Sequence, residues 1–269
     1  QQIINCIKKI KTFDAKFTVY LHEISEKLIK VQKNNLNDFK NILWIKNINK
    51  INQEPTIVIA NEFFDAFPIK QFFKQKNSWY EQCISFKDNN KRKITFYKNK
   101  INEKYIKKYS KFYNINKSKF IEYPMNIDSY VNSISRVIKK NNGIFLMFDY
   151  GYSSILGKNT IKAIKKHRVV NLLKEYTDCD ITFDINFNIL KKKFKKNNIR
   201  NIGIVPQNFF LQKMGIMERA SQIVKKEEVF SSRNLILSIN KLLNPKEMGN
   251  TFQALAFCKK NCKFKLGFI

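Results

Sequence analysis

The side chains best suited to chemistry stand directly after an apolar run of the sequence. Asn61, Glu62 and Asp65 follow the run 56–60, and bulky phenylalanines stand between and after them. A side-chain amide and two carboxylates at the rim of a buried strand could clamp a guanidinium group through charge-assisted, two-pronged hydrogen bonds. The alternative is that Asn61 and Asp65 cap a following helical turn while Glu62 faces water. Spacing alone favours this alternative.

Two other apolar runs also end in an acidic residue. Glu23 comes shortly after the run 17–21, and Asp149 follows the run 143–148, with Gly151 permitting a tight turn after it. In Rossmann-like sheets, an acidic residue after the second strand accepts hydrogen bonds from ribose hydroxyls. Glu23 fits equally well in the first turn of the next helix, where the helix dipole favours a carboxylate. Three acidic strand ends together support a site better than any one of them.

The elements around these residues follow from the hydrophobic pattern. A near-continuous apolar run predicts a strand that is covered on both faces, as in a parallel sheet. Helical patterns at 25–36 and 127–140 alternate with the three runs. We therefore predict an α/β fold, with a Rossmann-like, mostly parallel sheet and helices on both faces. Further along the chain we expect a helix, a strand, two helices and a last strand, at 186–197, 201–205, 207–225, 231–241 and 251–258.

A segment of different character interrupts this alternation. Three short antiparallel strands and a helix are expected in it, at 71–74, 79–86, 93–97 and 102–113. A turn at 88–90 would join the last two strands. We interpret 70–125 as an insertion within a single domain that spans 1–269. It would stand at the C-terminal edge of the sheet, where open α/β sheets bind their ligands.

The formal net charge of +30 could be the footprint of a nucleic acid or an anionic lipid. However, the excess is nearly all lysine, spreads along the whole chain, and accompanies abundant Asn, Ile, Phe and Tyr, as AT-rich codons produce. The lysines of 191–196 fall on the outer face of a predicted helix. Because no RNA-recognition motif, zinc finger or basic zipper accompanies the charge, we predict no nucleic-acid partner.

Cysteine and histidine usage argues against other classes of protein. The five cysteines are odd in number and lack framework spacing, which indicates a reducing compartment. Cys258 and Cys262 form the only close pair, and without a nearby His we expect no metal site. His22 at a strand end and His167 in a lysine-rich helix have no Ser or Cys nucleophile pattern nearby, so hydrolase chemistry is unsupported. No apolar run reaches the ~18 residues that a membrane span needs.

One long segment, residues 59–72, closely resembles the signature of the MidA-like family of class I methyltransferases. Shorter matches follow in the family's order, at 22–25 with Leu28 and Gln32, 149–151, Gly157 with Thr160, 167–168, 180–182 with Phe187, Gln207 with 210–211 and 215–216, and 248–249 with Phe252. The resemblance covers essentially the whole chain. Ordered matches in this number are a strong signal, whereas Asp-Tyr-Gly alone would be a weak one.

This resemblance implies a seven-stranded Rossmann-like fold, S-adenosyl-L-methionine as methyl donor, and methylation of an arginine on a protein substrate. In the mitochondrial member of the family, that substrate is a subunit of respiratory complex I. Carried over by position, Glu23 would hold the cofactor ribose, with Ile24 and Trp44 near adenine, and Asn61 and Glu62 would lie beside the sulfonium and the incoming nucleophile. The catalytic candidates are Asn61, Glu62 and Asp65, and the cofactor-binding candidates are Glu23, Ile24, Trp44, Asn61 and Asp149.

Two departures from the family pattern stand out. The family begins with a strand and a Gly-rich loop that wraps the methionine part of the cofactor, and nothing here matches them, so we expect the sequence to start after that loop. A His usually stands two residues after the family's Asp-x-Thr, here Asp180-Ile181-Thr182. In this sequence Asp184 occupies that place and could substitute for the His electrostatically.

A second hypothesis belongs to another class of protein. It is a non-catalytic assembly or binding protein that keeps the methyltransferase fold and docks a partner through the inserted hairpin. The unmatched cofactor loop favours it, and a homo-oligomer is compatible with either hypothesis. Unpaired cysteines and a composition of bacterial type favour a cytoplasmic location, with the mitochondrial matrix as the alternative.

Overall fold

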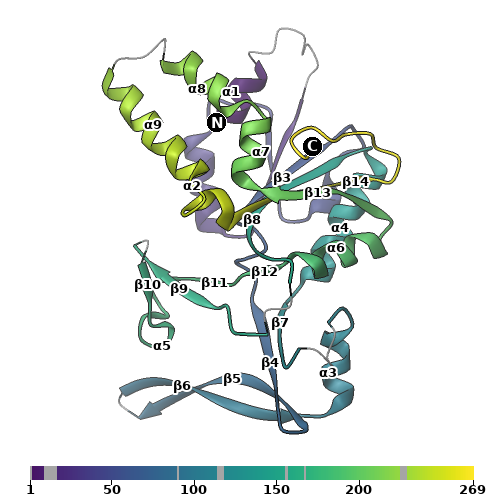
Figure 1. The fold of residues 1–269 in the computed structure, drawn as a ribbon, viewed down its shortest axis with the longest axis vertical. Coiled ribbons are helices and arrows are strands. Elements are labelled where there is room, and N and C mark those ends of the chain that lie inside the picture. Colours follow the sequence, from purple (N-terminus) through teal and green to yellow (C-terminus); the bar gives the residue numbers. More distant parts are fainter. Residues whose placement is uncertain are drawn as a thin grey trace. The chain divides into compact units, whose positions relative to one another are not determined.

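The computed structural model describes residues 2–8, 17–89, 91–113, 118–154, 157–166, 168–224 and 229–269. The chain divides into two compact units, 1–54 and 55–269 (Figure 1). Each unit has strands and helices of its own, and a single domain over 1–269 stays a prediction.

The first unit is a parallel strand pair joined by a helix. Its elements are α1 Gln2–Lys8, β1 Val19–His22, α2 Glu26–Asn35, β2 Ile42–Ile45 and a short 3-10 helix, Ile48–Lys50. β1 and β2 pair in parallel register, from Val19 opposite Ile42 onward. α2 begins where the sequence predicts it, because the Ser25 hydroxyl accepts a hydrogen bond from the Leu28 backbone N–H at 3.3 Å. The sequence pattern did not predict β2.

The second unit is built on a five-stranded sheet. Its strands are β3 Ile57–Asn61, β8 Ile144–Tyr152, β12 Ile185–Asn186, β13 Ile199–Pro206 and β14 Phe252–Lys259. β3 and β12 pair with β8 in parallel, whereas β14 pairs with both β8 and β13 in antiparallel register. The carboxyl ends of β3 and β8 therefore lie side by side at one edge of the sheet.

Helices cover both faces of this sheet. They are α4 Ile127–Lys140, α6 Phe187–Lys196, α7 Gln207–Lys213, α8 Ile216–Val224, α9 Val229–Leu243 and α10 Met248–Thr251. On one face, Phe194 of α6 stacks on Phe257 of β14 with ring centroids 4.1 Å apart. On the other, Phe210 of α7 packs against Phe148 of β8 at 5.3 Å. The predicted helix cover on both faces is thus confirmed (Figure 1).

The prediction that the run 56–60 is covered on both faces is wrong. Ile57 and Ile59 of β3 are 74% and 52% exposed. They share a face of the sheet with Leu146 and Phe148 of β8. The apolar cluster around Phe210 covers that face over β8, β13 and β14 and contains no residue of β3 among those described. Within the second unit, this face of β3 is uncovered because the cluster ends at β8.

The insertion forms a four-stranded antiparallel sheet of its own (Figure 1). Its elements are β4 Ile69–Gln75, β5 Ser78–Asn89, β6 Lys91–Ile101, α3 Glu103–Ser110 and β7 Phe120–Pro124, with strand order β6-β5-β4-β7. Ile106 and Tyr109 of α3 join Phe72, Trp79 and Ile121 in a buried cluster. The three predicted strands and the helix are confirmed, and β7 was not predicted. Position 90 of the predicted turn lies outside the described residues.

A small three-stranded sheet occupies a stretch in which the sequence pattern predicted no strands. Its elements are β9 Lys162–Lys165, β10 Arg168–Val170, α5 Leu172–Glu175 and β11 Asp180–Thr182. The prediction of a lysine-rich helix in this stretch is wrong, because β10 pairs with β9 in antiparallel register, with Arg168 opposite Lys165. His167 itself lies outside the described residues.

Candidate active site

Asn61 and Glu62 stand at the end of β3 with exposed side chains. The Glu62 backbone N–H donates to the Phe148 carbonyl of β8 at 2.9 Å, which extends the strand pairing by one residue. Glu62 then adopts a φ of +47°, in the left-handed region that costs a residue with a side chain about 1–2 kcal/mol. The Asn61 amide donates to the Glu62 carboxylate at 3.2 Å. A strained turn thus presents an amide and a carboxylate together at the rim of the sheet.

The segment after this turn is not a helix. Residues 62–68 form turns and bends, and the backbone hydrogen bond within the segment runs from Phe67 N–H to the Phe64 carbonyl at 3.2 Å. The alternative in which Asn61 and Asp65 cap a helical turn is therefore wrong. Phe64 is fully buried and packs edge-on against Phe63 at 5.1 Å, so aromatic packing holds the turn in place.

Asp149 connects the end of β8 to the turn after β3. Its side chain is fully buried, and Oδ2 accepts hydrogen bonds from the backbone N–H groups of Phe63 at 3.2 Å and Phe64 at 3.1 Å. Oδ1 accepts from the Tyr150 N–H at 3.0 Å. Burial, together with the nearby Asp65 carboxylate, raises the pKa of Asp149 to about 8, against the lowering effect of these bonds. These hydrogen bonds all come from backbone groups of the protein, and the role of Asp149 as a cofactor ligand stays a prediction.

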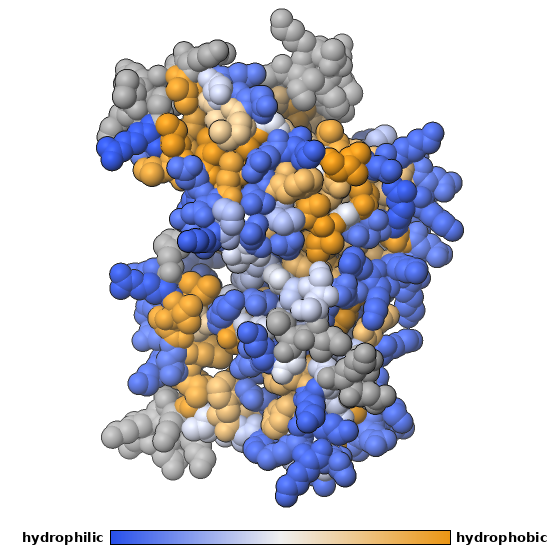
Figure 2. Space-filling view, viewed as in Figure 1, coloured by the Kyte–Doolittle hydropathy of each residue, from blue (hydrophilic) through white to orange (hydrophobic). Residues whose placement is uncertain are grey.

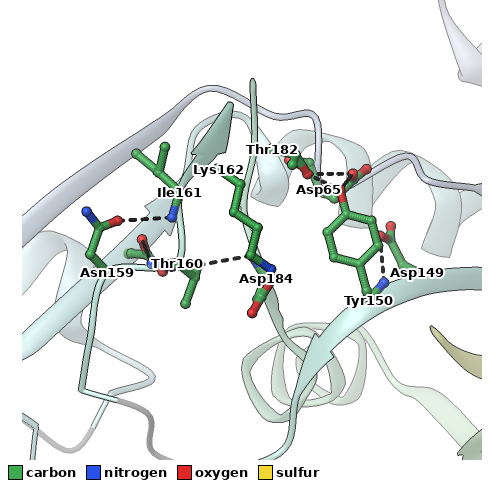
Figure 3. A network of polar contacts seen from close by, with 10 residues as sticks. Asp65, Asp149, Tyr150, Asn159, Thr160, Ile161, Lys162, Thr182 and Asp184 are labelled. Carbon is green, nitrogen blue, oxygen red and sulfur yellow. Dashed lines mark hydrogen bonds and ion pairs between the residues drawn. The ribbon is translucent and has the colours of Figure 1, made fainter. Parts of the chain in front are cut away.

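Asp65 is also buried, with 4% of its surface exposed. Figure 3 shows its side chain beside those of Thr182 and Tyr150. Its Oδ2 accepts from the Thr182 hydroxyl at 2.8 Å and from the Tyr150 hydroxyl. Its backbone carbonyl accepts from Phe183 N–H at 3.2 Å. Burial, followed by the hydrogen bond to Asp65, raises the pKa of the Tyr150 hydroxyl. Asp65 therefore fastens the turn after β3 to the end of β11, and its predicted catalytic role is untested.

The structural role of Gly151 differs from the tight turn that the sequence predicted. It lies within β8 and is not part of a tight turn. A Cβ built on it would stand 2.1 Å from the Ile185 carbonyl oxygen of β12. Gly151 is therefore required because β12 approaches β8 too closely for a side chain.

A second buried network joins the insertion to the segment that contains Asp184. Glu122 of β7 accepts from the Thr160 hydroxyl at 2.6 Å, the Thr160 N–H at 3.0 Å and the Gln71 amide at 2.8 Å. The Asp184 backbone N–H donates to the Thr160 hydroxyl at 2.9 Å (Figure 3). The Asp184 carboxylate pairs with Lys162 at 2.8 Å, so a cation already balances its charge. Sequence reasoning did not identify Glu122, whose partners are distant in the chain.

The remaining cofactor candidates belong to the first unit and lie together there. Glu23 Oε1 accepts from the backbone N–H groups of Ile24 at 2.8 Å and Ser25 at 2.9 Å. Gln32 bridges two of the candidates, because it donates to Glu23 Oε2 at 3.4 Å and accepts from the Trp44 indole N–H at 2.9 Å. Glu23 thus supports the start of α2 and also neighbours Trp44. That Glu23 forms one site with the acidic residues of the second unit stays a prediction.

The described residues contain no group of three or more His, Cys, Asp or Glu side chains that could hold a metal ion. No helix in the described part of the chain is long and apolar enough to cross a membrane.

The fold is that of class I methyltransferases, and comparison with known proteins assigns the family. The sequence model of a family described as S-adenosyl-L-methionine-dependent methyltransferases matches residues 1–205. The chain belongs to this family, which confirms the resemblance seen in its motifs.

Relatives with curated names lie close to this chain in sequence. Protein arginine methyltransferase NDUFAF7, mitochondrial, of Danio rerio is 27% identical over 79% of the chain and 49% of its own length. The Caenorhabditis elegans homolog of the same name is 30% identical over 88% of the chain and 55% of its own length. The chain therefore spans about half the length of the curated relatives it matches. Because these relatives are named mitochondrial, the expectation of a cytoplasmic location finds no support.

Two crystal structures from Burkholderia thailandensis share the fold. The first, a protein of the COG1565 superfamily, superposes with a TM-score of 0.77 at 18% sequence identity, over 93% of this chain and 68% of its own length. A second, whose crystals hold S-adenosyl-homocysteine, gives a TM-score of 0.74 at 18% identity, over 90% of this chain and 64% of its own. These likenesses confirm the predicted fold.

Proposed function

We propose that the full-length protein transfers a methyl group from S-adenosyl-L-methionine to an arginine of a protein substrate. The observation that carries this proposal is the strained turn at Glu62, which holds an exposed carboxylate and the Asn61 amide together at the end of β3. Membership of the methyltransferase family and the names of the curated relatives support it. Their mitochondrial names also favour the matrix as the location, and the family resemblance suggests a complex I subunit as the substrate.

Glu62 is suited to prepare an arginine for methylation. A guanidinium has a pKa above ~12 and is a poor nucleophile while it is protonated. A carboxylate can bind it through two parallel hydrogen bonds and accept the proton that leaves the attacking nitrogen. The cofactor supplies an electrophilic methyl group on a sulfonium. Asn61 would keep the Glu62 carboxylate aimed at the substrate.

The buried acids support a positioning role. Asp149 and Asp65 fix the two ends of the turn that carries Glu62, and their carboxylates are enclosed by protein groups. We therefore propose that both act through the position of Glu62 and do not touch the reacting atoms. This refines the catalytic assignment of Asp65 and the cofactor assignment of Asp149.

The first unit offers groups that fit the cofactor. Glu23 is half-buried, and its Oε2 accepts a long bond from Gln32, so it can still accept bonds from ribose hydroxyls. Ile24 is 68% exposed and Trp44 is half-buried, which together leave apolar surface for adenine. We propose that Glu23, Ile24 and Trp44 bind the adenosine part of the cofactor.

The test is Glu62→Gln in the full-length protein, with Glu103→Gln on the exposed surface of α3 as the matched control. Titration calorimetry should show S-adenosyl-L-methionine binding within about twofold of wild type for both variants. Methyl transfer should fall by roughly 10²–10⁴ in Glu62→Gln alone, the range for loss of a general base. Equal transfer in the two variants would reject the role of Glu62.

A second candidate function is a non-catalytic assembly protein, and one observation favours it. The β5–β6 hairpin exposes a stripe of apolar side chains in which Ile84, 57% exposed, stands opposite Phe96, 44% exposed. Such a stripe is a natural surface for a partner protein. Absence of any S-adenosyl-L-methionine binding at millimolar concentration would favour this candidate over the enzyme.

A further inference from the structure

A cationic hollow lies between α4 and α6, on the helices that cover one face of the central sheet. It has a volume of about 450 Å³ and is lined by four cationic side chains, Arg136 and Lys139 of α4 and Lys193 and Lys196 of α6. Asp128 is the one carboxylate in its lining. The side of the molecule that carries these helices is mostly hydrophilic (Figure 2). The hollow therefore combines a concave shape with a marked excess of positive charge.

The base of the hollow contains a buried lysine. The Lys193 side chain is 3% exposed, and its Nζ lies 2.5 Å from Asp128 Oδ1 and 3.4 Å from the Tyr123 hydroxyl. The Phe112 ring lies 4.7 Å from the same Nζ. Burial lowers the pKa of Lys193, and the neighbouring Lys196 lowers it further, against the effect of Asp128. Asp128 also accepts from the Tyr123 hydroxyl, so its carboxylate is shared between Lys193 and Tyr123.

A simpler account explains only part of this arrangement. Lys139 lies in the last turn of α4, and Lys193 and Lys196 lie in the last turn of α6, where cations offset the helix dipole. A chain of net charge +30 also places lysines on any tolerant surface. Neither reason explains why Lys193, a residue type that is costly to bury, lines the hollow with a buried side chain.

We propose that the hollow between α4 and α6 binds a multivalent anion, with phosphate or carboxylate groups spaced to meet Lys139, Lys193 and Lys196 together. The amides of Asn132 and Asn197 line the same hollow, joined to each other at 2.8 Å, and add donors for oxygen atoms. Arginine and lysine are the usual partners of both anion types. A free polyphosphate compound and an acidic segment of a protein share this chemistry. The proposal is independent of the methyl-transfer function.

The test compares two variants of the full chain that lower the net charge equally. Lys139→Gln/Lys196→Gln removes two exposed cations of the hollow, and Lys104→Gln/Lys241→Gln removes two exposed helix lysines elsewhere. Binding of inorganic tripolyphosphate and of a synthetic poly-aspartate peptide is measured by calorimetry at ~0.15 M salt, where distant surface charges are screened. The hollow variant should bind one or both probes roughly tenfold more weakly than wild type, because it loses two close charge contacts. The control should stay within about twofold.

Each outcome decides the matter. Selective loss of tripolyphosphate binding identifies a free phosphate ligand, and selective loss of peptide binding identifies an acidic protein segment; either supports the proposal. Equal weakening in both variants would show that net charge alone attracts the probes, and would overturn it. Absence of binding by wild type at millimolar concentrations of both probes would overturn it as well.

Discussion

Replacement of Asp149 by Asn should change how the stability of the protein depends on pH. The pKa of Asp149 is raised to about 8 in the folded protein, whereas an unfolded Asp titrates near 3.9. Between these values the folded state keeps a proton that the unfolded state has lost. The contribution of Asp149 is therefore complete below about pH 4 and is lost as the pH rises towards 8. Wild-type stability should fall as the pH rises through this window.

The size of the effect follows from the linkage between protonation and folding. One proton held by the folded state alone costs about 1.4 kcal/mol per pH unit, or roughly 3 kcal/mol between pH 5 and 7. In Asp149→Asn the amide oxygen can still accept from the Phe63 and Phe64 N–H groups, but the amide NH₂ then faces the Tyr150 N–H. Loss of that bond should lower stability by about 1–3 kcal/mol at every pH.

Urea unfolding at pH 5, 6 and 7, followed by circular dichroism, measures both effects. The free energy of unfolding of wild type relative to Asp149→Asn should fall by roughly 3 kcal/mol from pH 5 to 7. Asp128→Asn is the matched control, because hydrogen bonds from Lys193 and Tyr123 outweigh burial and lower the pKa of Asp128. Its contribution is lost only at more acidic pH, so its profile should run parallel to wild type. Parallel profiles for wild type and Asp149→Asn would refute the reasoning.

Three further substitutions test the packing around the site. Thr182→Val removes a 2.8 Å hydrogen bond to the buried Asp65 and should lower the free energy of unfolding by about 1–3 kcal/mol in urea titrations; no change would show that the bond does not form. Gly151→Ala places a Cβ 2.1 Å from the Ile185 carbonyl, so β12 must move, and a loss of about 1–3 kcal/mol is expected by thermal unfolding. Glu62→Gly relieves the left-handed strain and should raise stability by about 1 kcal/mol while abolishing methyl transfer; a loss of stability would contradict the strain.

Much of the fold could be predicted because its elements have strong local signals. The helix at 127–140 begins and ends where its pattern predicts, and the continuous apolar run 143–148 predicts most of β8, Ile144–Tyr152. The missed strands are short, none longer than five residues, and they are β2, β7, β9, β10, β11 and β12. β7 and β12 are stabilised by pairing with strands that are distant in sequence, β4 and β8. Local pattern therefore carries little information about them.

The sequence pattern placed Glu62 and Asp149 at strand ends, as the structure does, but it did not show how the acids are used. Strand ends and an ordered set of motifs identified Glu62 and Asp149. The same motifs could not show that Asp149 and Asp65 are buried acceptors, because their partners lie far along the chain. Phe64 and Asp149 are 85 residues apart, and Thr182 and Asp65 are 117 apart. Burial of a carboxylate depends on such contacts, which spacing within one segment does not reveal.

The exposed face of β3 was not predicted for a similar reason, because burial depends on contacts that are distant in sequence. An apolar run indicates that its side chains can be buried, but the cover is supplied by elements from elsewhere in the chain. Within the second unit, the cluster around Phe210 covers the strands on the far side of β8 and stops short of Ile57 and Ile59.

The central claim is that Glu62 prepares a protein arginine to receive a methyl group from S-adenosyl-L-methionine. The most direct measurement incubates the full-length protein with methyl-labelled S-adenosyl-L-methionine and isolated complex I subunits, and identifies the labelled residue by mass spectrometry. The account predicts label on arginine with wild type and with Glu103→Gln, and none above background with Glu62→Gln. Label on another residue type, or equal labelling by Glu62→Gln, would contradict it.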